Sequence, residues 1–478
     1  MKEAYNKIVV LLLVLSGLML VSSCKEDPEL PDNLVEFESA TLGIGDDESE
    51  LTVTLKLSRE ATLATQVSVQ IAPTGVVYGV DFTTEPAATA GIITLPIEKG
   101  TVSVSFTLIK EAGVLFDGDE QIVFTVAPTD ASLVTGSKAQ VTVTFSELIA
   151  LSGEMEVNGG GALYPNKVFI DLSANRQTAV QRTAWDFGFS SGSEFRVILN
   201  SSNGMMARAL TKTDLNAVTA ADTVGFGAQL SLAAVFAAIN STPIPDWVPE
   251  AINWIDDPAG DLSKTAIAEI SATLSENKVY IVNRGTGPGT PAQQLGWKKI
   301  RVIRNANGYT LQHADIGATS FSELQVTKNP AYAFQYVSLT TGAVVVEPVV
   351  DRWDIAWTGF TNSTNFGSGL VPYYFQDVIL QNMTGVAVVQ VLTSTITYEA
   401  FAETDLTGLD FSNQNQLKIG TSWRTGGGPG GPPSVRNDRF YVIRDAADNY
   451  YKLRFTSLTT SGERGRPRFE FALVKKGA

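Results

Sequence analysis

Two tryptophan-centred segments of this chain match each other. Trp185-Asp186-Phe187-Gly188-Phe189 has a later counterpart in Trp353-Asp354-Ile355-Ala356-Trp357. Three flanking landmarks recur in the same order around or after these segments. They pair residues 168–173 with 335–340, residues 200–204 with 362–367, and residues 300–309 with 440–446. A recurrence of several landmarks in one order predicts a duplicated domain.

Composition describes a packed, mostly β protein. The chain has 478 residues, enough for about three domains, with 44% hydrophobic and 18% charged residues. Short runs of alternating apolar and polar residues, broken by turn residues, are typical of antiparallel strands. The formal net charge of −15 argues against nucleic acid, because a long anionic backbone would be repelled. We therefore expect no nucleic-acid partner.

Two residue types are nearly absent, and their scarcity limits the chemistry. The single cysteine, Cys24, excludes an intrachain disulfide and a cysteine metal cluster. The single histidine, His313, excludes multi-histidine zinc sites and haem ligation by two histidines of one chain.

Residues 1–23 have the composition of a secretory signal. Lys2 and Lys7 precede an apolar run (8–21), which is short for a transmembrane helix. Ser22 and Ser23 directly before Cys24 resemble a bacterial lipobox, and the following Lys-Glu-Asp resembles the surface-export signal of Bacteroidota lipoproteins. The resemblance implies acylation of Cys24 and a tether over residues 24–33. The implied location is the outer-membrane lipid, with the chain facing the exterior; an ordinary signal peptide with an incidental cysteine is the alternative.

Residues 34–148 read as a β-sandwich that resembles the Calx-beta family. Strictly alternating strands are predicted at residues 51–57, 66–71 and 102–108, and two further strands are predicted at residues 122–126 and 139–145. The resemblance rests on Val35-Glu36-Phe37, on Gly79-Val80-Asp81-Phe82 and on Asp117-Gly118-Asp119-Glu120. Calcium-binding members of that family imply a calcium site, for which the oxygen donors here would be Glu36, Asp81, Asp117, Asp119 and Glu120. A spacer sandwich with solvated acidic loops is the alternative.

The two repeats are expected to span residues 150–328 and 329–478. The first carries an insertion with the chain's strongest helical signal at residues 230–239, which Pro243 and Pro245 follow. Trp247 and Trp254 follow it, either as a sugar-stacking platform or as a lid packed on the core.

The repeat motifs resemble the HmuY family of haem-binding surface lipoproteins. The resemblance rests on residues 353–357, on Asp438-Arg439-Phe440-Tyr441-Val442-Ile443-Arg444 and on Tyr451-Lys452-Leu453-Arg454-Phe455. It implies an all-β carrier of haem, or of another hydrophobic ligand, that serves an outer-membrane receptor. It also implies paired histidine or methionine ligands. The methionines available are Met205, Met206 and Met383, while His313, placed opposite Phe455, is expected to be a packing residue.

Other functions stay open at this point. The shortage of iron ligands favours the alternative of a non-enzymatic surface scaffold or adhesion protein. Asp186 and Asp354 are a pair of carboxylates of the kind a hydrolase uses, but one falls in each repeat, which indicates equivalent structural positions at strand ends. No nucleophile elbow, phosphate loop or dinucleotide fingerprint has a convincing context, so we expect no enzyme.

Overall fold

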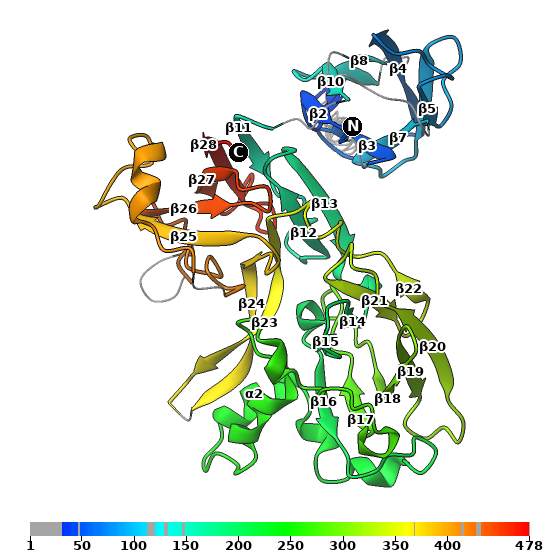
Figure 1. The fold of residues 1–478 in the computed structure, drawn as a ribbon, viewed down its shortest axis with the longest axis vertical. Helices are drawn as coiled ribbons and strands as arrows, with labels where there is room; N and C mark the ends of the chain where they lie inside the picture. The colour runs from blue at the N-terminus through cyan, green and yellow to red at the C-terminus, as the bar shows by residue number, and fades with distance from the viewer. Residues whose placement is uncertain are drawn as a thin grey trace, which may run out of the picture. The chain divides into compact units, whose positions relative to one another are not determined.

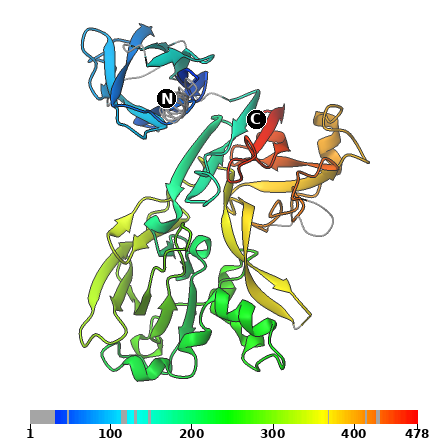
Figure 2. The same ribbon diagram turned by 180° about the vertical axis from the view of Figure 1, so that it is seen from behind.

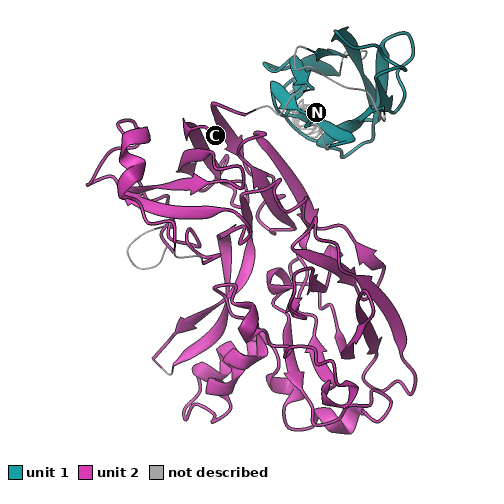
Figure 3. Ribbon diagram, in the orientation of Figure 1, with its two compact units in different colours: residues 1–147 teal, residues 148–478 magenta. Residues whose placement is uncertain are grey.

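The computed structural model is all-β, as predicted, and consists of two compact units. It describes residues 31–45, 48–111, 120–128, 132–145, 149–367, 369–412, 415–426 and 432–477. Residues 1–147 belong to the first unit and residues 148–478 to the second (Figure 3). Within those described ranges, no helix is both long and apolar enough to cross a membrane.

The first unit is a sandwich of two five-stranded sheets, as the alternating strands predicted. One sheet has the order β5 (Phe82–Glu85), β7 (Ser103–Lys110), β3 (Glu50–Leu57), β1 (Asn33–Phe37) and β9 (Leu133–Thr135). The other has the order β2 (Thr41–Gly43), β10 (Gln140–Thr144), β8 (Gln121–Pro128), β4 (Thr65–Thr74) and β6 (Ile92–Ile97).

Inward-facing side chains close this sandwich. Val53 on β3 lies opposite Phe106 on β7, and both are buried. Phe106 in turn meets Phe124 of the second sheet, with ring centroids 4.9 Å apart. Since burying one such side chain stabilises a fold by about 1.5–3 kcal/mol, contacts of this kind hold the two sheets together.

The second unit contains two five-stranded sheets of the same layout (Figure 1). The first sheet consists of β16 (Met206–Ala209), β17 (Tyr280–Asn283), β18 (Trp297–Asn305), β19 (Gly308–Ala314) and β20 (Ser322–Thr327), in that order. The second consists of β25 (Ala387–Leu392), β26 (Arg439–Arg444), β27 (Tyr450–Ser457), β28 (Arg468–Lys475) and β11 (Ser152–Glu156). β11, from the first repeat, therefore completes the sheet of the second.

Two four-stranded sheets join the repeats by exchanging hairpins. One has the order β13 (Arg176–Gln181), β12 (Asn166–Asp171), β23 (Ile355–Asn365) and β24 (Leu370–Gln381). The other has the order β15 (Val197–Leu199), β14 (Phe187–Ser190), β21 (Phe334–Ser338) and β22 (Gly342–Val344). Each repeat's hairpin thus pairs with the strand that follows the tryptophan of the other repeat.

The exchange is reciprocal down to single residues. Ile170 pairs with Ile355, and Val337 pairs with Phe187. The tryptophans follow the same rule, because Trp353 meets Phe169 at 5.1 Å and Trp185 meets Tyr336 at 4.8 Å, both edge to face. These four rings belong to one apolar cluster, so the repeats share a core.

The strand order corrects one predicted landmark. β17 and β26 hold the same place in their sheets, as do β18 and β27. Lys299 on β18 therefore corresponds to Lys452 on β27, and both ammonium groups donate to backbone carbonyls of connecting loops, at 2.6 to 2.9 Å. The predicted match of residues 300–309 with 440–446 pairs β18 with β26 and is therefore wrong by one strand. Neighbouring strands alternate in a similar way, so their sequence patterns do not distinguish them.

A second landmark is also corrected. The side-chain amide of Asn200 donates to the carbonyls of Arg182 and Trp185, at 2.7 and 2.8 Å. Asn382, and not the predicted Asn362, does the same in the second repeat, with the carbonyls of Val350 and Trp353. The segment that separates Asn382 from its motif is longer than the corresponding segment before Asn200. The second repeat has therefore gained the long β23–β24 hairpin.

The predicted helix is present as α2 (Leu232–Ile239). The hydroxyl of Ser231 accepts the Ala234 amide at its start, at 3.1 Å, and Asn240 caps its end. Short 3₁₀ turns complete the unit at residues Arg182–Ala184, Ser201–Asn203, Ala220–Thr223, Gly227–Gln229, Val248–Trp254, Leu262–Lys264, Leu274–Glu276 and Glu403–Gly408.

Candidate ligand-binding surface

The three methionines offered as haem ligands lie in three different environments. Met205 and Met206 are 1% and 0% exposed and pack into separate apolar clusters. Consecutive strand residues point to opposite faces, which explains the separation. Met383 is 41% exposed, in the turn after β24. Of these three, Met383 alone is therefore exposed to solvent.

His313 lies half-buried on β19, where its backbone pairs with Ile300 and Ser322. Burial lowers the pKa of His313, and the nearby charge of Lys298 lowers it further, so the imidazole is neutral at pH 7. The predicted counterpart, Phe455, instead shares its place in the sheet with Val302, since β27 corresponds to β18.

The predicted calcium donors are only partly within the described residues. One carboxylate oxygen of Glu36 accepts from the Ser137 hydroxyl and the Lys138 amide, at 2.9 and 3.2 Å. Asp81 accepts from the Val77 amide at 2.7 Å. Across the described residues, no three His, Cys, Asp or Glu side chains gather as a metal site. Asp117 and Asp119 lie outside the described residues, as does Cys24, whereas Glu120 lies directly before β8. Calcium stays a prediction.

Trp247 and Trp254 stack on each other, with ring centroids 5.8 Å apart and planes 12° from parallel. Trp254 is buried, and the Arg208 guanidinium lies 5.0 Å from its ring and 4.6 Å from that of Phe226. One face of Trp247 is therefore occupied by Trp254, and the pair packs as a lid on the helical insertion.

The paired aspartates after the tryptophans satisfy strand-end amides, as the sequence suggested. Asp186 accepts the Leu339 amide at 2.7 Å, and Asp354 accepts the Leu172 amide at 2.8 Å. Arg284 binds both oxygens of Asp186, at 2.7 and 3.0 Å. Burial, reinforced by the neighbouring Asp171, raises the pKa of Asp354 well above its usual range. Both aspartates are buried and belong to the exchange of hairpins.

Two uncharged stretches meet on one side of the second unit. No charged residue occurs among residues 223–245, which include α2, or among residues 355–376, which include most of the β23–β24 hairpin. In a chain with 18% charged residues, two such gaps are long. α2 packs against β24, so the two uncharged stretches lie side by side (Figures 1 and 2). Sequence reasoning missed this signal, although a scan for missing charge would have found both stretches.

Aromatic rings crowd this helix–hairpin surface. Tyr373 on β24 lies 5.1 Å from Phe375, 5.4 Å from Phe366 and 5.9 Å from Phe236 of α2, measured between ring centroids. Phe236 and Phe366 stay 48% and 49% exposed. Leu370, at the hairpin tip, is also largely exposed. Exposed apolar residues normally occur singly, so a group of this kind is a candidate binding surface.

Hydrogen bonds fix the hairpin to the first repeat. The Tyr374 hydroxyl donates to the Ser202 carbonyl at 3.0 Å, and the Thr361 hydroxyl donates to the Ser201 carbonyl at 2.8 Å. The hydroxyls of Ser202 and Thr358 lie 2.9 Å apart in a buried position. The hairpin is therefore held firmly at its root, and its aromatic outer part is positioned by that attachment.

A buried aspartate shapes the point from which the hairpin extends. Asp377 adopts a left-handed backbone conformation, with φ +53°, at a bulge in the β23–β24 pairing. Its carboxylate accepts from the Tyr164 hydroxyl at 3.2 Å and forms an ion pair with Arg464, while Arg424 lies 3.9 Å away. The strained position is thus compensated by several partners from loops of both repeats.

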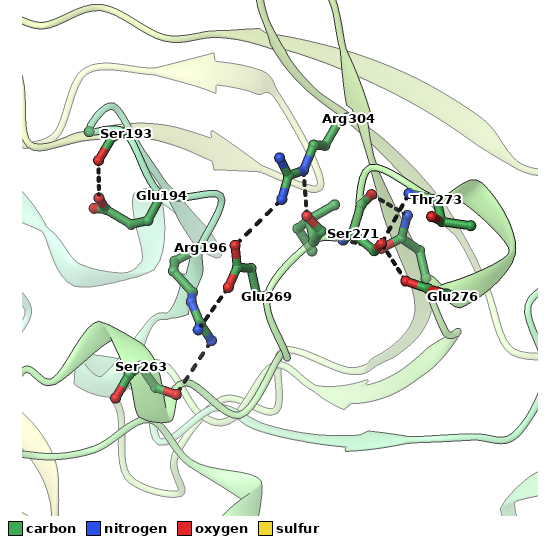
Figure 4. A network of polar contacts seen from close by, with 12 residues as sticks. Ser193, Glu194, Arg196, Ser263, Glu269, Ser271, Thr273, Glu276 and Arg304 are labelled. Atoms are coloured by element: carbon green, nitrogen blue, oxygen red, sulfur yellow. Dashed lines mark hydrogen bonds and ion pairs between the residues drawn. The ribbon is translucent and has the colours of Figure 1, made fainter.

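A charged network lies elsewhere in the same unit (Figure 4). Glu269 accepts from Arg196 at 3.2 Å and from Arg304 at 3.4 Å. Arg196 also donates to the Ser263 carbonyl, and Arg304 donates to the Ile270 carbonyl. These bonds fasten the loop between the helical insertion and β17 to strands β15 and β18. They serve structure, in contrast to the uncharged surface.

The chemical requirements of haem can be compared with the residues of the helix–hairpin surface. A porphyrin has two flat apolar faces, which uncharged aromatic rings can cover. Its iron needs donor atoms, and the implied histidine and methionine pairs do not fit, since His313 lies on β19, Met205 and Met206 are buried, and Met383 lies beyond the end of β24. The surface therefore fits the ring of the ligand but not the implied iron ligands.

Comparison with solved structures gives matches of low similarity. The apo form of the Calx CBD1 domain matches at 15% identity and a TM-score of 0.21, over 24% of this chain and 96% of that one. A putative carbohydrate binding protein from Bacteroides ovatus matches at 12% identity and a TM-score of 0.19, over 93% of this chain and 99% of that one. No curated protein matches the chain.

Comparison with protein families gives a decisive result. The HmuY protein family matches residues 163–328 and again residues 331–471. Together these segments cover well over half of the chain and coincide with the two repeats. The chain therefore belongs to the HmuY family and carries the family's domain twice in tandem.

Proposed function

We propose that this chain is a surface binding protein that holds haem, or another flat hydrophobic ligand, on the helix–hairpin surface. The observation that carries the proposal is the meeting of two uncharged stretches, which present Phe236, Phe366 and Tyr373 together. Membership of the HmuY family supports it. The protein is proposed to act by binding alone, without catalysis.

The energetics favour an apolar ligand at this surface. Each 100 Å² of apolar area removed from water contributes about 2.5 kcal/mol, so a porphyrin covering several rings offsets the cost of association. The chain's charge of −15 acts against the two carboxylates of haem. We therefore expect haem to associate faster as salt rises, because screening weakens that repulsion.

The location proposed for this activity is the outer membrane. Acylation of Cys24 would attach the chain to lipid through residues 24–33, facing the exterior, and an outer-membrane receptor would take the ligand. Incorporation of labelled palmitate, lost in Cys24→Ser, tests the anchor. Retention of the label in that variant would contradict it.

The binding proposal is tested by titrating haem into the chain that starts at residue 25, read in the Soret band. Phe236→Ala and Phe366→Ala each remove a half-exposed ring from the surface, and we expect each to weaken binding by roughly tenfold or more. Leu274→Ala is the matched control, since Leu274 is 55% exposed in a 3₁₀ turn elsewhere, and its loss should leave binding unchanged.

The outcomes separate the two candidate functions. A saturable Soret shift that both phenylalanine variants weaken supports the carrier. A shift lost in Met383→Ala but unchanged in the phenylalanine variants would place the site at Met383 instead. No shift in either redox state would leave a non-enzymatic surface scaffold, whose motivating observation is the burial of Met205 and Met206.

A further inference from the structure

We infer that Tyr373 supplies the oxygen ligand for the iron of a haem bound to the helix–hairpin surface. The inference rests on the proposed function and concerns the donor atom that the expected histidine and methionine pairs do not provide. Two features of Tyr373 support this role: the position of its ring and its free hydroxyl.

Position is the first argument. Tyr373 is the common neighbour of the surface rings, since Phe236, Phe366 and Phe375 all lie within 6 Å of its ring centroid. A flat ligand that covers these rings therefore passes over Tyr373. Met383 lies beyond the other end of β24, and a strand rises about 3.3 Å per residue, so roughly 25 Å separates Tyr373 from the end of its strand at Gln381.

The hydroxyl is the second argument. Tyr373 is half-buried, and its hydroxyl makes no hydrogen bond to any residue that the structure describes. Its neighbour Tyr374 points to the opposite face and donates its hydroxyl to the Ser202 carbonyl. The hydroxyl is not one of the fully buried polar atoms that lack a partner, so it is open to solvent and available to a ligand at the centre of the surface.

The chemistry of the donor fits ferric haem. Phenolate from tyrosine is a known axial ligand of haem iron. Tyr373 would hold a ferric iron through its phenol oxygen and would give its proton to water, so that the negative phenolate would face the positive ferric centre. A ferrous haem centre carries no such net positive charge. We therefore expect the chain to hold ferric haem more tightly than ferrous haem.

The experiment compares Tyr373→Phe with the wild-type chain from residue 25. The variant keeps the ring and its three aromatic neighbours but removes the oxygen. We expect ferric haem to bind at least tenfold more weakly, with loss of the phenolate-to-iron charge-transfer band and of the high-spin ferric resonance that phenolate ligation gives. Tyr332→Phe is the control, because Tyr332 lies in the connection between β20 and β21, outside the helix–hairpin surface, and its haem spectrum should match that of the wild type.

Metal-free protoporphyrin separates this inference from the proposed function. It should bind wild type and Tyr373→Phe equally, because it has no iron to ligate. If wild type binds haem and Tyr373→Phe gives the same spectrum and affinity, the tyrosine ligand is overturned while the carrier stands. If wild type binds neither haem nor protoporphyrin, the proposed function fails, and the ligand role fails with it.

Discussion

At the scale of single residues, Asp186 shows what a duplicated motif does. Its side chain is 1% exposed, both oxygens meet Arg284, and one also accepts the Leu339 amide from the other repeat. We expect Asp186→Ala to destabilise the second unit by about 3–5 kcal/mol, because the half-buried Arg284 and the amide both lose their partner. Urea denaturation followed by tryptophan fluorescence measures the change.

The control for this substitution is an ion pair at the surface. Asp315 binds Lys298 at 2.6 Å, but its side chain is 77% exposed. Water replaces that partner, so Asp315→Ala should cost about 0–1 kcal/mol. Equal losses in the two variants would show that Asp186 is not the structural anchor described here.

The residue scale also shows how far sequence reasoning reached. It predicted that the aspartates after the tryptophans satisfy strand-end amides, because Trp-Asp recurred in one context. It did not predict which strand supplies each amide, since the partners of Asp186 and Asp354 come from the other repeat. Pairing across repeats leaves no trace in the spacing of either motif. Tyr373 was missed as well, because an aromatic residue on an alternating strand looks like any core residue.

At the scale of elements, the exchange of hairpins explains why the repeats form one unit. Three ladders cross between them: β11 with β28, β12 with β23, and β14 with β21. The sequence predicted the strands well, because alternation is local. It misjudged the equivalent of residues 300–309, because similar alternation recurs on neighbouring strands. It also misjudged the equivalent of Asn200, because the longer hairpin of the second repeat shifts the spacing between the tryptophan and the asparagine.

The exchange predicts that cutting the connection between the repeats does not separate them. A protease site inserted between Lys328 and Ala333 lies between β20 and β21, outside every ladder. After cleavage, we expect both fragments to elute together in size-exclusion chromatography, since the three ladders and the shared aromatic core still join them. Separation in native buffer would contradict the exchange.

A double variant provides the comparison for that experiment. Phe169→Ala with Tyr336→Ala removes one aromatic residue from each exchanged hairpin and leaves the backbone ladders intact. Each truncation costs about 3–5 kcal/mol in a packed core. The cleaved double variant should therefore dissociate at a lower urea concentration than the cleaved wild type.

At the scale of the whole molecule, each unit has its own core, and the tryptophans report on only one of them. All seven tryptophans lie between residues 185 and 423, in the second unit. We therefore expect tryptophan fluorescence, excited at about 295 nm to exclude tyrosine, to follow only the second unit, while circular dichroism follows both. The two denaturation curves should not coincide, because we expect two units with separate cores to unfold in separate steps.

Two substitutions show which unfolding transition belongs to which unit. Phe106→Ala removes a ring that joins the two sheets of the first unit and should destabilise that unit by about 3–5 kcal/mol. It should shift the dichroism curve and leave the fluorescence curve in place, whereas Asp186→Ala should shift both. A fluorescence midpoint that moves with Phe106→Ala would show that the units stabilise each other. Since calcium is predicted only for the first unit, added calcium should likewise act on the dichroism curve alone.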